Sequence, residues 1–276
     1  SKVSNYYGQE INRDTYNLAR MNLILHGLNY LDFNIELGDT LLNPLHKDMK
    51  FDGIVSNPPL SIKWSADSSL LEDPRFEPFG KLAPKSNADY AFIQHMIYHL
   101  RNNGAMAVVL PHGVLFRAGN EKSIRKQLID NNYLDAVIGL PANLFYSTAI
   151  PCVILVFRKN RNNNDILFID ASKDYQKAKN QNKLRDKDID KIINAYRNRN
   201  NIDQYSYKAN LDEIKENDYN LNIPRYVDTF VYEDSKSINE IYNELREVSK
   251  KLDSINEEID KSCKDLGFKS PIFKEI

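Results

Sequence analysis

The sequence predicts an α/β fold built on a largely parallel sheet, followed by a separate helical tail. Short apolar runs alternate with stretches of helical period between residues 12 and 157, which is typical of strands joined by helices. One of these runs ends in Asn57-Pro58-Pro59, and two successive prolines stop a strand abruptly. A heptad pattern then fills the end of the chain. The 276 residues are enough for one large domain with an appendage.

Each expected element follows from a local pattern. Asn12 is placed to cap a helix that runs to Leu25, and Gly27 is placed to stop it. Further helices are expected at Ala88–Leu100, Lys122–Asn131 and Asp186–Tyr196. Strands are expected at Val3–Tyr7, Phe33–Leu37, Phe51–Ser56, Ala105–Leu110, Leu134–Gly139, Cys152–Phe157 and Ile166–Ile169. The strands at Leu134–Gly139 and Cys152–Phe157 are expected to form an antiparallel hairpin.

Two segments follow no clear period. Residues 62–85 would form a loop of a length that is expected only where it is functional or disordered. Residues 220–227 contain too few apolar side chains to be expected in a core. A polar break at Asn160–Asn164 separates an α/β domain at 1–159 from a basic extension at 160–232.

The tail, residues 233–276, has the most regular pattern. Ser237 and Glu240 can form a capping box at the start of a helix. Apolar residues then recur at alternating spacings of 3 and 4, which is an a/d stripe over three heptads. The stripe consists of Ile238, Ile241, Leu245, Val248, Leu252, Ile255 and Ile259. So narrow a stripe needs a helical partner, which could be another part of this chain, a second copy or a different subunit.

Composition excludes several protein classes. Charged residues are 27% and apolar residues 42% of the chain, with no signal peptide and no run near the roughly 20 apolar residues of a membrane span. A cytoplasmic protein without a membrane partner is therefore expected. Cys152 and Cys263 have no paired spacing, and His95 and His99 stand at i,i+4 without a metalloprotease Glu. No metal site is predicted, and the two histidines are assigned to a helix surface.

Charge is unevenly distributed along the chain. The formal net charge is −1, yet residues 158–199 hold 12 Lys/Arg against 6 Asp/Glu. A basic stretch of this kind suits contact with phosphates, and an ordinary solvated surface explains it equally well.

Asn57-Pro58-Pro59-Leu60 is the segment that points to chemistry. Its Asn57 amide and Pro58 carbonyl are expected as unpaired acceptors at the carboxyl end of a strand, where open α/β sheets bind ligands. Two rigid acceptors suit an exocyclic amine, such as that of adenine, and would localise its lone pair for attack on a methyl donor. A base inside a duplex must first be flipped out for such chemistry. An ordinary strand-ending turn is the alternative.

Five motifs in register resemble those of a known family. They are Tyr7-Gly8-Gln9-Glu10-Ile11-Asn12, Leu37-Gly38-Asp39-Thr40-Leu41, Ser56-Asn57-Pro58-Pro59, 138–145 (Ile-Gly-Leu-Pro-Ala-Asn-Leu-Phe) and 220–227 (Asn-Leu-Asn-Ile-Pro-Arg-Tyr-Val). Together they resemble the modification (M) subunit of type I restriction-modification systems, an S-adenosylmethionine-dependent N6-adenine DNA methyltransferase. The likeness, from about Tyr6 to Asp228, implies a Rossmann-like methyltransferase sheet and a catalytic domain at 1–159.

The resemblance assigns roles to particular residues. Glu10 would accept hydrogen bonds from the cofactor ribose, and Asp39 from the cofactor adenine amine. A helix-start carboxylate and an Asx turn are their respective structural alternatives. Asn57 would hold the target amine with Pro58 and also border the cofactor.

At the catalytic loop this sequence departs from the family. M subunits usually place Phe or Tyr at the position of Leu60, after Pro59, to stack on the flipped adenine. Trp64 is close enough in sequence to offer a stacking face instead.

The resemblance also implies partners. They are DNA, a second M subunit, a restriction (R) subunit and a specificity (S) subunit that would read the target and dock on Ile238–Ile259.

One family feature is missing from the sequence. S-adenosylmethionine sites use a glycine-rich turn after the first strand, but the ten glycines here are never within five residues of one another. We therefore expect a fragment that lacks the first strand and cannot methylate DNA by itself. Its sheet is expected to show a gap or a displaced Val3–Tyr7.

Two other functions stay open. A protein-glutamine N5-methyltransferase also uses Asn-Pro-Pro before an aromatic residue, although the heptad tail and residues 220–227 argue against it. A non-enzymatic assembly module would bind its partner subunit through Ile238–Ile259.

Overall fold

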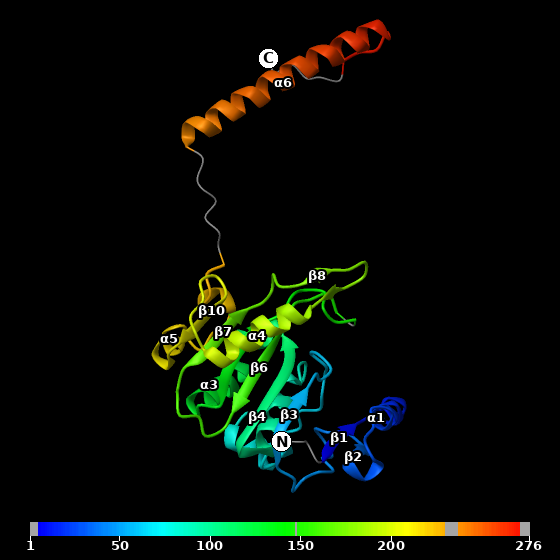
Figure 1. The fold of residues 1–276 in the computed structure, drawn as a ribbon, viewed down its shortest axis with the longest axis vertical. Helices are drawn as coiled ribbons and strands as arrows, with labels where there is room; N and C mark the ends of the chain where they lie inside the picture. Colours follow the sequence, from blue (N-terminus) through cyan, green and yellow to red (C-terminus); the bar gives the residue numbers. More distant parts are fainter. Residues whose placement is uncertain (1–4, 147, 230–236, 271–276) are drawn as a thin grey trace. The chain divides into compact units, whose positions relative to one another are not determined.

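The computed structural model describes residues 5–146, 148–229 and 237–270. The chain divides into two compact units, Ser1–Thr229 and Phe230–Ile276. In the first unit, helices pack on a mixed sheet, whereas the second contains one long helix (Figure 1).

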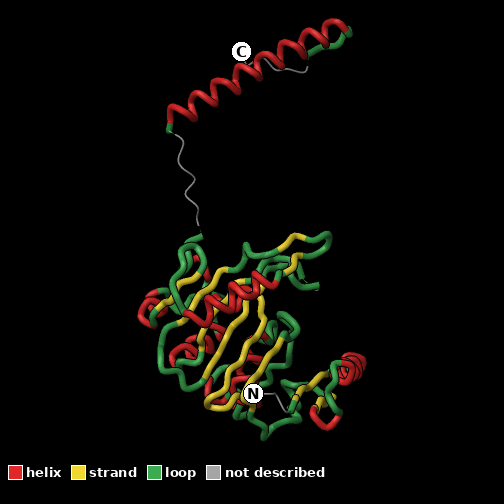
Figure 2. Tube along the Cα trace, in the orientation of Figure 1, coloured by secondary structure: helices red, strands yellow, loops and turns green. Residues whose placement is uncertain are grey.

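A six-stranded sheet forms the centre of the first unit (Figure 2). Its order is β10-β7-β5-β6-β4-β3. β3 pairs parallel with β4, and β5 with β7, whereas β6 runs antiparallel between β4 and β5. The antiparallel pairing expected for β5 and β6 is therefore confirmed. The strands are β3 (Phe51–Ser56), β4 (Leu100–Pro111), β5 (Leu134–Gly139), β6 (Cys152–Arg158), β7 (Ile166–Asp170) and β10 (Ser206–Ala209).

Side-chain alternation along the strands divides the core between the two faces of the sheet. Val137 belongs to one apolar cluster, and its neighbours Ala136 and Ile138 belong to the other. The first cluster includes residues of α2 (Asp89–His99) and α3 (Asn120–Asp130). The second includes residues of α4 (Asp186–Asn198), which covers β7 from the opposite face. Helices on both faces are what an α/β chain with buried strands requires.

The expected gap in the sheet is confirmed. β1 (Tyr6–Glu10) and β2 (Phe33–Leu37), joined by α1 (Arg13–Leu25), form a separate parallel pair. Neither of them pairs with the larger sheet in the described ranges, so β3 is an edge strand. Val55 of β3 is 88% exposed, although strand valines are usually covered.

The expectation of a first strand at Val3–Tyr7 was wrong in its bounds. Gly8 and Gln9 continue the ladder with Ile35 and Glu36, so β1 extends to Glu10. Glycine therefore does not end this strand. Val3 lies outside the described residues.

The prediction that residues 220–227 stay outside a core was also wrong. Leu221 and Ile223 are at most 2% exposed, and the Tyr226 ring stacks on Phe168 with centroids 3.9 Å apart. Ile223 packs so closely over Gly139 that a Cβ there would come within 2.6 Å of it. The segment has few apolar residues, but all of them face inward, which a count of residue types does not reveal.

Residues 62–85 form a packed loop. Two short 3-10 turns, Ser68–Glu72 and Glu77–Phe79, shape it, and Phe76 is fully buried. Beyond β7, the chain adds a small hairpin of β8 (Gln176–Lys177) and β9 (Asn182–Lys183), and later α5 (Leu211–Glu216).

The second unit contains α6 (Ile238–Asp265). The predicted capping box is present: Ser237 N donates to Glu240 Oε2 at 2.7 Å, and Glu240 N donates to Ser237 Oγ at 3.2 Å. All seven stripe residues are exposed, from 38% at Ile259 to 86% at Ile238. No helix among the described residues is long and apolar enough to cross a membrane.

Candidate active site

Four parallel strands end at one edge of the six-stranded sheet. The segments that follow β3, β4, β5 and β7 all begin at this edge. They begin at Asn57, His112, Leu140 and Ala171. In an open α/β sheet this carboxyl edge is the usual position of a ligand site.

Asn57 immediately follows the last residue of β3. Its side chain is exposed, whereas Pro58 is buried and anchors the turn. No donor from the described residues bonds to the Asn57 amide oxygen or to the Pro58 carbonyl. Both oxygens therefore lack a protein donor among the described residues.

A buried carboxylate holds the end of this turn. Ser61, at φ 51°, donates from its backbone N to Asp89 Oδ1 at 2.8 Å and from its hydroxyl to Oδ2 at 3.3 Å. Asp89 also receives a hydrogen bond from Arg117, which pairs with Glu121 at 2.6 Å. Burial raises the pKa of Glu121, and the charge and hydrogen bond of Arg117 oppose that shift. This network, absent from our sequence-based predictions, fixes the turn from beneath.

The two acids predicted to bind the cofactor lie at neighbouring strand ends. Gly38 N donates to the carbonyl of Glu10 at 2.9 Å, which joins the ends of β1 and β2. Glu10 Oε1 accepts from Asn12 N at 2.7 Å, and Asp39 Oδ1 accepts from Leu41 N at 2.8 Å. Each carboxylate thus uses one oxygen to accept from a nearby backbone N–H. This is what a helix-start carboxylate at Glu10 and an Asx turn at Asp39 would do.

The second oxygens, Glu10 Oε2 and Asp39 Oδ2, have no hydrogen-bond partner among the described residues. Two such acceptors at adjacent strand ends fit the hydroxyls and the amine of a nucleoside. The sequence supplies no glycine-rich turn for the methionine part of S-adenosylmethionine. The residues present therefore fit the nucleoside half of that cofactor.

Arg75 connects the two parts of the site. Its guanidinium, buried and paired with Asp73 at 2.7 Å, donates to the carbonyls of Thr40 and Leu41 at 3.0 and 2.8 Å. Arg75 Nη1 also lies 3.1 Å from His95 Nδ1. Since arginine only donates, this nitrogen of His95 is the acceptor. The packed loop at residues 62–85 thus holds the Asp39 loop in place.

The prediction that His95 and His99 lie on a helix surface was wrong. His99 is 2% exposed, its ring 4.5 Å from that of His95. Burial, reinforced by His99 and Arg75, lowers the pKa of His95 to about 3. No group of three or more His, Cys, Asp or Glu side chains that could hold a metal ion occurs among the residues described.

Two aromatic residues near the site differ from expectation. Trp64 packs against the core, with its ring 5.7 Å from Phe76 and its indole N–H donating to Pro84 O at 3.1 Å. The contact with Phe76 thus uses part of the ring surface that the sequence analysis had offered for stacking on a base. Tyr146, on the loop after β5, is 97% exposed and was not singled out from the sequence, although it directly follows the 138–145 motif.

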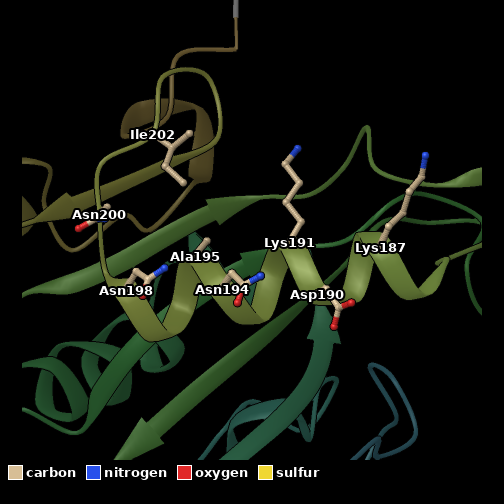
Figure 3. Close-up of a pocket in the computed structure, with 8 residues that line it drawn as sticks. All are labelled: Lys187, Asp190, Lys191, Asn194, Ala195, Asn198, Asn200 and Ile202. Atoms are coloured by element: carbon tan, nitrogen blue, oxygen red, sulfur yellow. The ribbon is translucent and has the colours of Figure 1, made fainter.

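A surface hollow on the outer side of α4 contains none of the predicted site residues (Figure 3). Its lining is Lys187, Asp190, Lys191, Asn194, Ala195, Asn198, Asn200 and Ile202. Lys191 is already engaged, 2.9 Å from Asp174 and 3.8 Å from the centre of the Tyr205 ring. The candidate site is therefore the carboxyl edge.

Comparisons with known proteins show the family to which the chain belongs. The profile of the family described as N-6 DNA Methylase matches residues 1–235. The chain is 39% identical to the type I restriction enzyme MpnII methylase subunit of Mycoplasma pneumoniae, over 96% of this chain and 51% of that protein. It is 35% identical to the HindI methylase subunit of Haemophilus influenzae, over 95% of this chain and 62% of that protein.

Solved structures give the same relationship. The methyltransferase subunit of a type I restriction-modification system from Streptococcus thermophilus matches with a TM-score of 0.79 and 55% identity, covering 81% of this chain and 48% of that one. A putative class I S-adenosylmethionine-dependent methyltransferase from Listeria monocytogenes shares the fold (TM-score 0.53, 18% identity), over 70% of this chain and 55% of that one. The chain spans about half the length of the first curated relatives it matches. It has the fold of S-adenosylmethionine-dependent methyltransferases and belongs to the N-6 DNA methylase family.

Proposed function

We propose that this chain carries the target-base site of an N6-adenine DNA methyltransferase, the modification subunit of a type I restriction-modification system in the cytoplasm. One observation carries the proposal: Asn57 and Pro58 offer two unpaired acceptors at the carboxyl edge, in a chain of the N-6 DNA methylase family. Two acceptors match the two N–H groups of the adenine amine.

In this mechanism the protein orients the amine. Asn57 Oδ1 and the Pro58 carbonyl would each accept a hydrogen bond from one N–H group of the amine. These two bonds would localise the nitrogen lone pair for attack on the methyl group. S-adenosylmethionine supplies an electrophilic methyl group on a sulfonium. When bound, this cofactor would give its methyl group to the oriented nitrogen, with the electron pair of the C–S bond staying on sulfur, and the amine would then lose one proton to solvent. Catalysis would come from orientation and from stabilising the developing charge.

The other site residues would support this arrangement. Glu10 and Asp39 would accept from the cofactor nucleoside through their second oxygens, and Asn57 would border the cofactor. Asp89 is a positioning residue, because it bonds Ser61 at the end of the turn formed by Asn57, Pro58, Pro59 and Leu60.

Replacing Asn57 tests the proposal. In a full-length methylase that contains this chain, assembled with its specificity subunit, Asn57→Ala should abolish methyl transfer while DNA and cofactor binding stay near wild type. The loss belongs in kcat, because the amide makes its main contact with the reacting amine. Asn43→Ala, at another exposed asparagine, is the control. An unchanged turnover number for Asn57→Ala would refute the assignment.

We further propose that the Ile238–Ile259 stripe docks on the helices of the specificity subunit, in a complex that also contains a second modification subunit and a restriction subunit. Exposed apolar residues along three heptads support a helical partner. Val248→Asp with Leu252→Asp should abolish co-purification with the specificity subunit. Asn243→Asp with Lys250→Asp, off the stripe, should leave it intact. A complex that survives the first pair would contradict docking through the stripe.

A further inference from the structure

The hairpin of β8 and β9 is fixed to the loop that follows β5. Asn182 donates from its backbone N to Asn143 O and from its side chain to Ala142 O, both at 2.8 Å. The Gln181 side chain donates to Leu144 O. These bonds use the side-chain amides of Gln181 and Asn182, and none of them uses a lysine of the hairpin. These hydrogen bonds therefore fix the hairpin to a loop at the carboxyl edge of the sheet.

Three lysines on this hairpin have no acidic partner. Lys177, Lys179 and Lys183 are exposed, and none pairs with a carboxylate in the described part of the chain. Of the acids near the hairpin, Asp174 pairs with Lys191 at 2.9 Å and Asp188 with Arg185 at 2.8 Å. The three lysines of the hairpin therefore take part in no ion pair among the described residues.

The chemistry of the hairpin fits a phosphate backbone better than a protein surface. Residues 176–183 contain no large apolar side chain, whereas the centres of protein interfaces are depleted in charge and enriched in aromatics. Closely spaced exposed cations suit DNA phosphates. Tyr146 is 97% exposed on the loop to which the hairpin is bonded, and surfaces on which bases stack combine exposed aromatic rings with cationic side chains.

The topology sets the hairpin at a useful distance from Asn57. The loop after β5, to which the hairpin is bonded, lies three strand positions from β3, and β7, which precedes the hairpin, lies four. At about 4.8 Å per strand this is roughly 14 to 19 Å, or the rise of about four to six base pairs at 3.4 Å each. A duplex with its target base at Asn57 would thus bring flanking phosphates to the hairpin.

We propose that residues 176–183 bind the phosphate backbone of DNA a few base pairs from the target adenine. This inference rests on the proposed function, since it takes DNA as the substrate held at Asn57. The lysines would add sequence-independent affinity and hold the register of the duplex.

The salt dependence of duplex binding tests this surface. The triple variant Lys177→Gln, Lys179→Gln, Lys183→Gln is compared with Lys47→Gln, Lys208→Gln, Lys215→Gln, which removes the same charge from exposed positions elsewhere. Fluorescence anisotropy with a 30-base-pair duplex should show weaker binding for the hairpin variant. Its slope of log K against log salt should fall by about 2 to 3, near 0.9 per lost contact. The control variant should keep the wild-type slope, and thermal melting should be equal for all three proteins.

Several outcomes would overturn the proposal. Equal slopes of log K against log salt for the two triple variants would show that the hairpin lysines do not contact DNA. Equal competition by polyglutamate and by DNA for the wild-type protein would indicate an acidic protein partner instead. Failure of the proposed function is distinguishable in the full-length methylase, because Asn57→Ala would then leave kcat unchanged. The hairpin variant should raise the KM for DNA about tenfold or more at unchanged kcat.

Discussion

The six-stranded sheet and the smaller sheet of β1 and β2 differ sharply in burial. Every residue of β5 is buried in the six-stranded sheet, whereas α1, between β1 and β2, buries none. Leu18 and Leu25 on α1 are 58% and 76% exposed. Both regions have well-formed helices and strands, so local signals suffice to shape the elements. Burial requires a second layer, and the larger sheet has one on each face.

The comparison separates the two halves of the candidate site. Asn57 follows a strand of the larger sheet and is held from below by Asp89, whereas Glu10 and Asp39 end strands of the smaller one. The smaller sheet meets the rest through a few contacts, including the Tyr7 and Phe51 rings at 5.4 Å and the Arg75 bonds to the Asp39 loop. We infer that the target-base half is more rigid than the cofactor half.

The largest expected effect comes from removing a side chain of the larger core. Phe168 is fully buried against Tyr226, so Phe168→Ala should lower the free energy of unfolding by about 3–5 kcal/mol. Leu18→Ala on α1 should change it by less than about 0.5 kcal/mol, since that residue is largely exposed. Urea denaturation of both variants measures the difference. Comparable losses would show that α1 is buried in solution, and the contrast between the sheets would fail.

A pH series should detect the lowered pKa of His95, which lies beside Arg75. Because its folded-state pKa, about 3, lies below its unfolded value near 6.5, His95 stays neutral in the folded protein while the unfolded chain takes up a proton. Stability is therefore complete above pH 6.5 and falls as the pH drops towards 3. Between pH 7.5 and 5 the loss from His95 should be about 2 kcal/mol.

His95→Gln provides the control, because glutamine keeps an acceptor for Arg75 without titrating. Denaturant unfolding at pH 7.5 and 5 should show a smaller loss for this variant than for wild type. Buried His99, whose pKa burial also lowers, should account for part of the remainder. Identical pH profiles for the two proteins would contradict the neutral, buried state of His95.

The sequence predicted what depends on local patterns. The Asn-Pro-Pro turn, the helix capped by Asn12 and the heptad helix all appear near their expected positions. It did not predict the Asp89–Ser61 network, because those residues are 28 positions apart and only folding brings them together. The burial of residues 220–227 was missed for the same reason, since a few well-placed side chains decide it.

The smallest expected effect concerns a helix cap in each region. Asn12 Oδ1 accepts from Asp14 N at 2.9 Å and from Thr15 N at 3.0 Å, and Asn210 Oδ1 accepts from Glu213 N at 2.9 Å. Each Asn→Ala change should cost its helix about 1 kcal/mol. α5 buries Ile214 in the core, so Asn210→Ala should lower global stability by that amount. α1 buries nothing, so Asn12→Ala should speed hydrogen exchange in α1 alone while the global unfolding midpoint stays fixed. A shift of that midpoint with Asn12→Ala would mean that the smaller sheet unfolds together with the larger one.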